Sequence, residues 1–399
     1  YQQVNWLESE SGMLFPNPPR RISISLKKNY QQVEVGDMIK LRMMLQPPQG
    51  KIFPDDFDFE IYSEFKKIGA RGFAFGDIEI VQKAEISNID WWFLSLRENI
   101  RGRINKVLPR EIYGDRGAIA QAFLIGDKEE ISANMMEKIR NSGLAHLLSI
   151  SGFHLSLAGF ILFSLTRFLL SRSEYLLLTF DLKKIAAIIA IFGSYFYLQI
   201  AGTPLPAQRA FLMIALVLLA LFIGEKLNLR RAVMTSAMAL ILFNPFSLFS
   251  VGFQLSFAAI LVLCGFHDHF KSHINPNILV KVRKYFLGII LLSIIIQIAT
   301  APFLMRSFQN VAVLGFMANV LAIPITAFLV MPLGIMSLLL MLIGFEKYSL
   351  ILMGQGINLI EKVIIFISDF KYSHLMSPKL SEFGLLLAII GLLLIFLSK

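Results

Sequence analysis

The chain has 399 residues, of which 55% are hydrophobic and 17% charged, and its mean hydropathy is +0.63. Soluble globular proteins carry about a quarter charged residues, so this composition argues against an ordinary cytosolic enzyme. The 35 phenylalanines and the low charge exclude a disordered chain. The single cysteine, Cys264, excludes a disulfide scaffold and any cysteine-based zinc or iron–sulfur site.

Charge divides the chain into two parts. Residues 1–142 hold 20 basic and 20 acidic residues, whereas residues 143–399 hold 18 basic and 8 acidic ones and carry the whole net charge of +10. A polyanionic partner would therefore be attracted to the second part. We predict a small β-rich external domain over residues 1–90, an amphipathic interfacial connector over 91–142 and a multi-span transmembrane domain over 143–399.

The first part has the pattern of short strands. Alternating or β-branched runs predict strands, turn residues separate them, and one short helix is expected between the second and third strands. Such a pattern suits a small β-barrel of the oligonucleotide-binding type, and it suits other small α+β domains equally well. The predicted strands are Arg21–Lys27, Ile39–Leu45 and Arg71–Val81, the turns are Val35–Asp37 and Pro47–Gly50, and the helix is Ile61–Ile68.

The connector combines aromatic and basic residues. Trp91, Trp92 and Phe93 come first, as is typical of a helix that lies at a membrane surface. An ordinary surface helix with one packed tryptophan has the same pattern, so both interpretations stay open. The basic residues that follow are Arg97, Arg101, Arg103, Lys106 and Arg110.

The second part is a series of apolar segments, and a membrane-spanning helix needs about 20 such residues. The seventh segment would reach about 50 Å as one helix. Because Pro324 and Pro332 interrupt it, we expect a broken or re-entrant segment there. The candidates are Leu144–Leu170, Ile185–Gly202, Ala207–Gly224, Ala232–Phe249, Val251–Phe266, Tyr285–Met305, Val311–Gly344, Tyr348–Ile367 and Phe383–Ser398.

Basic residues are concentrated in alternate loops, whereas the opposite loops hold only Arg306. Cytoplasmic loops carry an excess of Lys and Arg, so we expect the basic side in the cytoplasm and residues 1–142 outside it. The basic loop residues are Arg172, Lys183, Lys184, Lys226, Arg230, Arg231, Lys271, Lys281, Arg283 and Lys284.

Polar residues are clustered where the first apolar segment begins. Two imidazoles and two hydroxyls at membrane depth are costly unless they face protein or water. Hydrogen bonding between helices, with a glycine for close packing, is the structural alternative to a functional role. The cluster consists of Gly143, His146, Ser149, Ser151, Gly152 and His154.

Two enzymatic interpretations of this cluster are weak. Ser151 before Gly152 is similar to the nucleophile turn of intramembrane serine proteases, which pair the serine with a histidine from another helix. The remaining histidines, however, are expected in loops or outside a span. His146 and His154 are roughly 12 Å apart along a helix and have no nearby carboxylate, so we expect no metal site. The histidines in question are His267, His269, His273 and His374.

Further polar or helix-breaking residues lie in the later segments. Arg209, near the start of its segment, either extends to the membrane surface or lines a path for an anion. The others are Asn244, Pro245, Gln254, Ser256, Gln297, Asn319 and Pro324.

The stretch from His146 to His154 closely resembles the hallmark of the ComEC competence proteins, the DNA internalisation channels of bacterial natural transformation. Ser149 and Phe153 stand where alanine and leucine are usual in that family, and no metallo-β-lactamase-like domain follows the bundle. Other similar stretches occur in the family's order. They are Val35–Asp37, Phe53–Asp58, Leu124–Asp127, Gly202–Met213, Asn244–Phe257 with Gly252, Pro302, Phe308 and Ala318–Pro324.

This resemblance implies passage of single-stranded DNA through the bacterial cytoplasmic membrane, with an external barrel of the oligonucleotide-binding type. A DNA strand carries one phosphate charge per nucleotide, so its path requires donors and positive potential. The residues that we expect along the path are His146, Ser149, Ser151, His154, Arg209, Gln254 and Asn319. Those expected to shape the helices are Gly143, Gly152, Pro245, Gly252 and Pro324.

Several expectations concern partners. The sequence contains no nucleotide-binding G-x-x-x-x-G-K-[ST] loop, so we expect a separate motor or DNA-receptor protein in addition to the lipid bilayer, and a homo-oligomer is possible. We expect no cofactor and no catalytic activity. Two other functions stay open, namely a secondary transporter of a small anionic solute and a scaffold subunit. The absence of an internal repeat among the spans weakens the transporter.

Overall fold

The structure is a computed structural model of the whole chain. It divides the chain into two compact units, residues 1–96 and 97–399. The structure describes residues 2–3, 21–25, 37–48, 50, 60, 63, 68–82, 89–150, 152–224, 229–243, 245–270, 278–308, 310–370 and 373–397.

The first unit contains a four-stranded sheet. Strands β1 (Gln2–Gln3), β2 (Arg21–Ser25), β3 (Met38–Gln46) and β4 (Ala70–Gln82) have the order β1-β2-β4-β3, with β2 parallel and β3 antiparallel to β4. The three predicted strands are confirmed. The predicted helix Ile61–Ile68 lies mostly outside the described residues.

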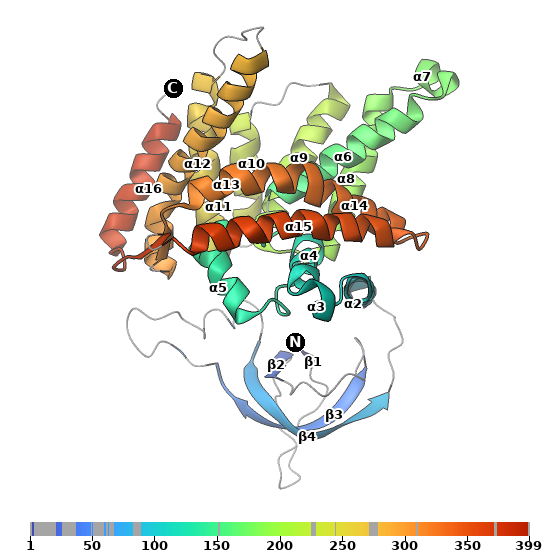
Figure 1. The fold of residues 1–399 in the computed structure, drawn as a ribbon, viewed down its shortest axis with the longest axis vertical. Coiled ribbons are helices and arrows are strands. Elements are labelled where there is room, and N and C mark those ends of the chain that lie inside the picture. The colour runs from blue at the N-terminus through green and yellow to red at the C-terminus, as the bar shows by residue number, and fades with distance from the viewer. Residues whose placement is uncertain are drawn as a thin grey trace. The chain divides into compact units, whose positions relative to one another are not determined.

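The curvature of β3 and β4, visible in Figure 1, has a local cause. Register shifts interrupt the pairing between Met38 and Ile39 and between Lys40 and Arg42, and such bulges bend a strand. Gly72 lets the two backbones approach, because a Cβ there would lie 2.1 Å from the Met44 carbonyl oxygen. The result is a mixed, half-barrel sheet that is only loosely similar to an oligonucleotide-binding barrel.

Four helices precede the long apolar ones: α2 (Ile89–Val107), α3 (Arg110–Tyr113), α4 (Arg116–Ile125) and α5 (Ala133–Asn141). Helix α4 is buried from Gly117 to its end, so this part of the predicted connector is core rather than surface. Helix α5 begins where the Ser132 hydroxyl accepts a hydrogen bond from the Met135 amide, as N-cap residues do.

The long apolar helices follow, and together they show a polytopic helical membrane protein. Helix α7 (Glu174–Thr179) and the π-helical turn η3 (Thr326–Val330) are short elements among them. The others are α6 (Gly152–Leu170), α8 (Leu182–Ile200), α9 (Leu205–Ile223), α10 (Leu229–Phe243), α11 (Val251–Phe270), α12 (Ile278–Phe308), α13 (Gly315–Ile325), α14 (Met331–Leu340), α15 (Glu346–Ser368) and α16 (Glu382–Leu397).

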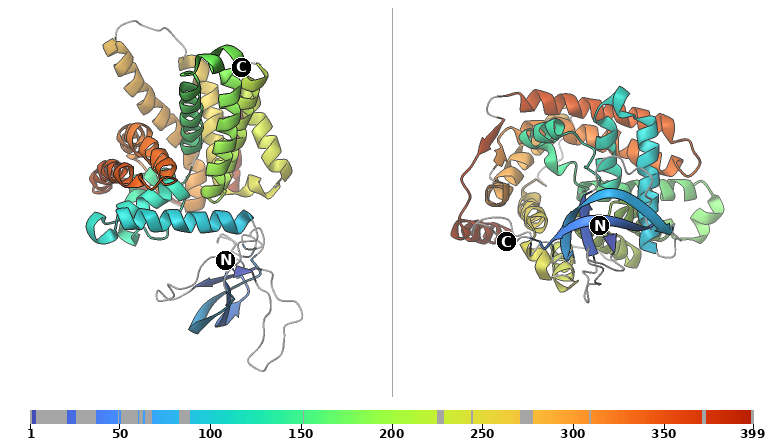
Figure 2. Two further views of the ribbon diagram at one scale, coloured as in Figure 1. Left: turned by 90° about the vertical axis from the view of Figure 1, so that its right-hand side faces the viewer. Right: turned by 90° about the horizontal axis from the view of Figure 1, so that it is seen from below.

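Six of the described segments are long and apolar enough to cross a membrane: α6, α8, α9, part of α12, the α13–α14 segment and α15. They do not share one direction. In Figures 1 and 2, helices α13, α14 and α15 run across the steep helices α6, α8 and α9. Helix α15 packs along both α13 and α14, so these three form a layer of their own within the second unit.

Four sequence-based expectations about the helices are corrected. Residues Leu144–His146 form a separate 3-10 turn, η1, so the first long helix begins only at Gly152. Helix α10 ends at Phe243, and Pro245–Phe249 form a 3-10 turn, η2. Helix α11 continues to Phe270, so His267 and His269 lie in a helix rather than a loop.

The fourth corrected expectation concerns the seventh apolar segment, Val311–Gly344. It is continuous from Gly315 to Leu340 rather than broken or re-entrant. Pro324 lacks the amide proton that an α-helical turn requires, and the turn that follows widens into η3 before the α-helix resumes at Met331.

Candidate functional site

Just upstream of the hallmark stands a glycine that no other residue can replace without strain. Gly143 has φ +78°, in the left-handed region, and it stands directly before η1. A Cβ at Gly143 would lie 2.9 Å from the Cα of Gly315, the first residue of α13. The residues just upstream of the hallmark are therefore in close contact with the start of α13, the helix that carries the last stretch of family resemblance.

The four polar residues of the hallmark are not equivalent. The His146 side chain is exposed, and its Nδ1 lies 3.0 Å from the Gly143 carbonyl oxygen. Ser149 is half-buried, and Ser151 lies outside the described residues. His154 is fully buried in α6, where its ring contacts those of Phe123 and Phe153 at centroid distances of 5.4 and 5.7 Å. The two histidines thus differ in exposure.

Arg209 is the most unusual buried side chain of the molecule. It is 1% exposed in the second turn of α9, and none of its three guanidinium nitrogens has a hydrogen-bond acceptor among the described residues. Its Cζ lies 5.7 Å from the ring centroid of Phe253 and 5.5 Å from that of Phe257, both in α11. Cation–π contact offsets part of the desolvation of this charge, but it supplies no counter-ion.

The starts of three helices meet beside Arg209. A Cβ at Gly152, the first residue of α6, would lie 3.6 Å from the Cβ of Ala210 in α9. A Cβ at Gly252, in the first turn of α11, would lie 3.6 Å from Cγ of Pro206 in α9. Because helix N-termini carry partial positive charge, this junction of α6, α9 and α11 favours an anion. We call it the helix-start junction.

The other predicted residues lie around these helices. The Gln254 side-chain amide donates to the Leu248 carbonyl oxygen at 3.3 Å, and the exposed Pro245 begins η2. Asn319 lies in α13, where its buried Oδ1 has no hydrogen-bond partner among the described residues. The structure therefore places Gly152, Arg209 and Gly252 at one junction, and it places Asn319 on the helix that Gly143 contacts.

Sequence reasoning missed an ionic network at α2. The Arg97 guanidinium donates to the Ile125 carbonyl oxygen at 3.0 Å and lies against Gly202, whose φ is +76°. Arg101 forms ion pairs with Asp127 and Glu98. The spacing of Arg97 and Arg101, together with the acid at the end of the Leu124–Asp127 stretch, is the signal that could have found it.

The pKa values of the two arginines in this network are shifted in opposite directions. Burial lowers the pKa of Arg97. For Arg101, burial acts in the same direction, but the carboxylates of Asp127 and Glu98 overcome it and raise the pKa. The network joins α2 to the α4–α5 loop and to the turn after α8.

No metal centre was found in the part of the chain that the structure describes, because no three His, Cys, Asp or Glu side chains come together there.

Residues 123–399 match the family model described as "Competence protein". The chain belongs to this family. ComE operon protein 3 of Bacillus subtilis (strain 168) is 25% identical to this competence protein over 316 residues, which are 79% of this chain and 37% of the relative. The chain thus spans little more than a third of that relative.

Two further relatives extend the comparison. Competence protein ComA of Neisseria gonorrhoeae is 30% identical over 145 residues, which are 36% of this chain and 20% of the relative. An uncharacterized protein of Aquifex aeolicus (strain VF5) is 28% identical over 337 residues, which are 83% of this chain and 74% of the relative. No solved structure matches this competence protein.

Proposed function

We propose that this competence protein transports single-stranded DNA across the bacterial cytoplasmic membrane. The observation that carries the proposal is the buried guanidinium of Arg209, which has no acceptor among the described residues. A buried cation without a counter-ion is unfavourable unless an anion binds it during function. A DNA phosphate supplies such an anion once per nucleotide.

The helix-start junction suits a phosphate that binds only transiently. Phe253 and Phe257 stabilise the guanidinium while the site is empty, and the starts of α6, α9 and α11 add positive potential when a phosphate arrives. Conduction requires binding that is weak enough for release. A single arginine that is already partly stabilised satisfies this requirement better than a cluster of cations.

Uptake of labelled DNA tests this proposal. Cells that lack the gene are complemented with the wild type, with Arg209→Gln or with Arg209→Lys. We expect Arg209→Gln to reduce uptake by about tenfold or more, since one charge-assisted contact is lost at each phosphate. Arg209→Lys is expected to restore part of the uptake because it keeps the charge.

Protein abundance and stability distinguish a transport role from a structural one. Removal of a buried, unpaired cation should leave the thermal stability of Arg209→Gln unchanged or raise it. Arg231→Gln, which removes an exposed arginine of α10, is the matched control and should transport normally. Normal DNA uptake in the deletion strain would overturn the proposal, and flux of a small anion through proteoliposomes without DNA uptake would favour a secondary transporter.

We further propose that the N-terminal unit is an external domain of the oligonucleotide-binding type and that a separate motor or receptor protein drives transport. The mixed, curved sheet of β1–β4 and the basic loops of the membrane part support the first proposal.

A further inference from the structure

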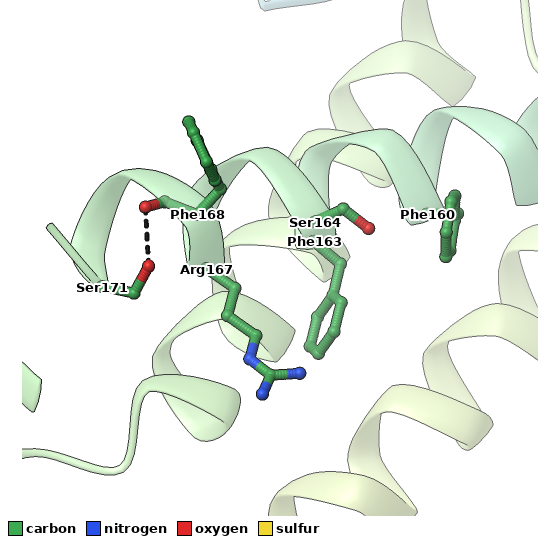
Figure 3. Close-up of a pocket in the computed structure, with 6 residues that line it drawn as sticks. All are labelled: Phe160, Phe163, Ser164, Arg167, Phe168 and Ser171. Atoms are coloured by element: carbon green, nitrogen blue, oxygen red, sulfur yellow. Dashed lines mark hydrogen bonds between the residues drawn. The ribbon is translucent and has the colours of Figure 1, made fainter.

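A groove on the outer face of α6 lies near the end of that helix. It is an open cavity of about 360 Å³ (Figure 3). Its lining residues come from one face of α6 and, at Ser171, from the turn that follows the helix, at spacings of one, three or four residues. They are Phe160, Phe163, Ser164, Arg167, Phe168 and Ser171.

Aromatic side chains line this α6 groove, and two of them are exposed. Phe160 is 66% exposed and Phe168 is 54% exposed. Phe163 is half-buried and packs against the cluster of Ala187, Ala190 and Leu218, so the groove is anchored on α8 and α9. Exposed aromatic side chains on a membrane-spanning helix face hydrocarbon, which suits an acyl chain.

Two arginines mark one end of the groove. Arg167 lines it directly, and the Arg172 Cζ lies 4.6 Å from the ring centroid of Phe168. Among the described residues, no carboxylate lies within ion-pair distance of either guanidinium. The Ser171 hydroxyl donates to the Phe168 carbonyl oxygen at 2.8 Å, and its oxygen can still accept a hydrogen bond (Figure 3). The groove is therefore apolar along its length and cationic at its end.

The surroundings of the arginines belong to a membrane surface. Helix α7 follows directly and exposes Leu177 and Leu178, which are 55% and 85% exposed. The exposed lysines Lys183 and Lys184 come at the start of α8, in the same basic loop. Basic loops face the cytoplasm, and the cytoplasmic leaflet carries the anionic lipids that attract such residues.

We propose that the α6 groove binds an anionic phospholipid of the cytoplasmic leaflet, with its phosphate at Arg167 and Arg172 and an acyl chain along Phe160 and Phe168. A DNA strand suits the groove less well. Its bases would need flat stacking partners and a cationic track along the whole path, whereas the charge here is confined to one end.

Native mass spectrometry of the full chain in detergent tests the proposal with phosphatidylglycerol as the added lipid. We expect the wild type to retain bound phosphatidylglycerol. We expect the double variant Arg167→Gln, Arg172→Gln to lose about thirtyfold in affinity, since two basic residues at about 1 kcal/mol each contribute about 2 kcal/mol at a membrane surface. Phe160→Ala should weaken the retention as well, because it removes part of the acyl-chain wall.

Three controls make the outcome decisive. Arg231→Gln removes one positive charge at α10, outside the groove, and should leave retention unchanged. Phosphatidylcholine should be retained less than phosphatidylglycerol, and glycerol phosphate should not compete. Equal loss in Arg231→Gln, or displacement by glycerol phosphate or an oligonucleotide, would overturn the proposal. The readout is independent of DNA uptake, so this proposal and the proposed function can fail separately.

Discussion

Two glycines join parts of the chain that lie far apart in the sequence. Gly143 and Gly202 both have positive φ angles, and each lies against a partner from a distant part of the chain. The partner of Gly143 is the backbone of Gly315, which has no freedom to move away as a side chain would. The partner of Gly202 is the flexible end of Arg97. A substitution is therefore expected to be worse at Gly143 than at Gly202.

We predict that Gly143→Ala destabilises the protein more than Gly224→Ala does. Both residues have positive φ, at +78° and +89°, so both substitutions cost about 1 kcal/mol of backbone strain. Only Gly143 adds a steric contact, because nothing lies within 4 Å of a Cβ at Gly224. Thermal unfolding in detergent should therefore give a lower midpoint for Gly143→Ala, and equal midpoints for the two variants would contradict the backbone contact.

At the scale of helices and strands, local patterns predicted the existence of most elements. Alternation in the first part predicted β2, β3 and β4, and runs of apolar residues predicted the long helices from α6 to α16, although not the short helix α7. The start of α6 was wrong because residues 144–150 are as apolar as a helix. The break there comes from the left-handed Gly143 and its contact with α13, which no local pattern contains.

The candidate site could be predicted only in part, for the same reason. Polarity at membrane depth singled out His154 and Arg209, and both are buried. Their surroundings depend on which helices pack together, so the aromatic neighbours of Arg209 in α11 could not be foreseen. The pairing of Arg101 with Asp127 was missed because it joins residues 26 positions apart. Whether the predicted residues lie along a DNA path stays a prediction.

We predict that an ion pair holds α15 to α4. Arg116 Nε lies 3.0 Å from Glu361 Oε2, and the side chains are 29% and 11% exposed, respectively. A double-mutant cycle with Arg116→Gln and Glu361→Gln should give a coupling of about 1 kcal/mol, since a partly buried pair is screened less than an exposed one.

The matched control is the pair of Arg306 and Glu382, which lie 2.8 Å apart with the glutamate 86% exposed. Exposed pairs contribute little, so its coupling should be close to zero. Equal couplings for the two pairs would contradict a stabilising role of the contact between α15 and α4.

In the second unit, the directions of the helix axes differ, and this affects which apolar helices can cross a membrane together. Helices α13–α15 run across α6, α8 and α9 in both figures, so these helices cannot all lie along one bilayer normal. Helix α15 also contains four charged residues, of which Glu346 and Glu361 pair with Arg103 and Arg116. Hydropathy alone predicts a membrane-spanning helix for every apolar segment of sufficient length. It contains no information about the direction of the helix.

We predict that residue 23 is outside the cytoplasm and that residue 183 is inside it. Single cysteines are introduced as Ser23→Cys and Lys183→Cys in a Cys264→Ala background, which removes the buried native thiol. The excess of basic residues in the loops around α7 and α8 is the reason for this orientation. A membrane-impermeant thiol reagent applied to intact cells should label only position 23, and labelling of position 183 under these conditions would reverse the orientation.

The wide turn η3 has a consequence for how side chains are distributed beyond Pro324. A π-helical turn holds one residue more than an α-helical turn, and one residue corresponds to about 100° of rotation. The stripe of side chains that α13 presents to α15 is therefore displaced around the axis when it continues in α14. Removing a single residue between Thr326 and Val330 would bring both stripes into phase, and α14 would then turn a different set of side chains toward α15.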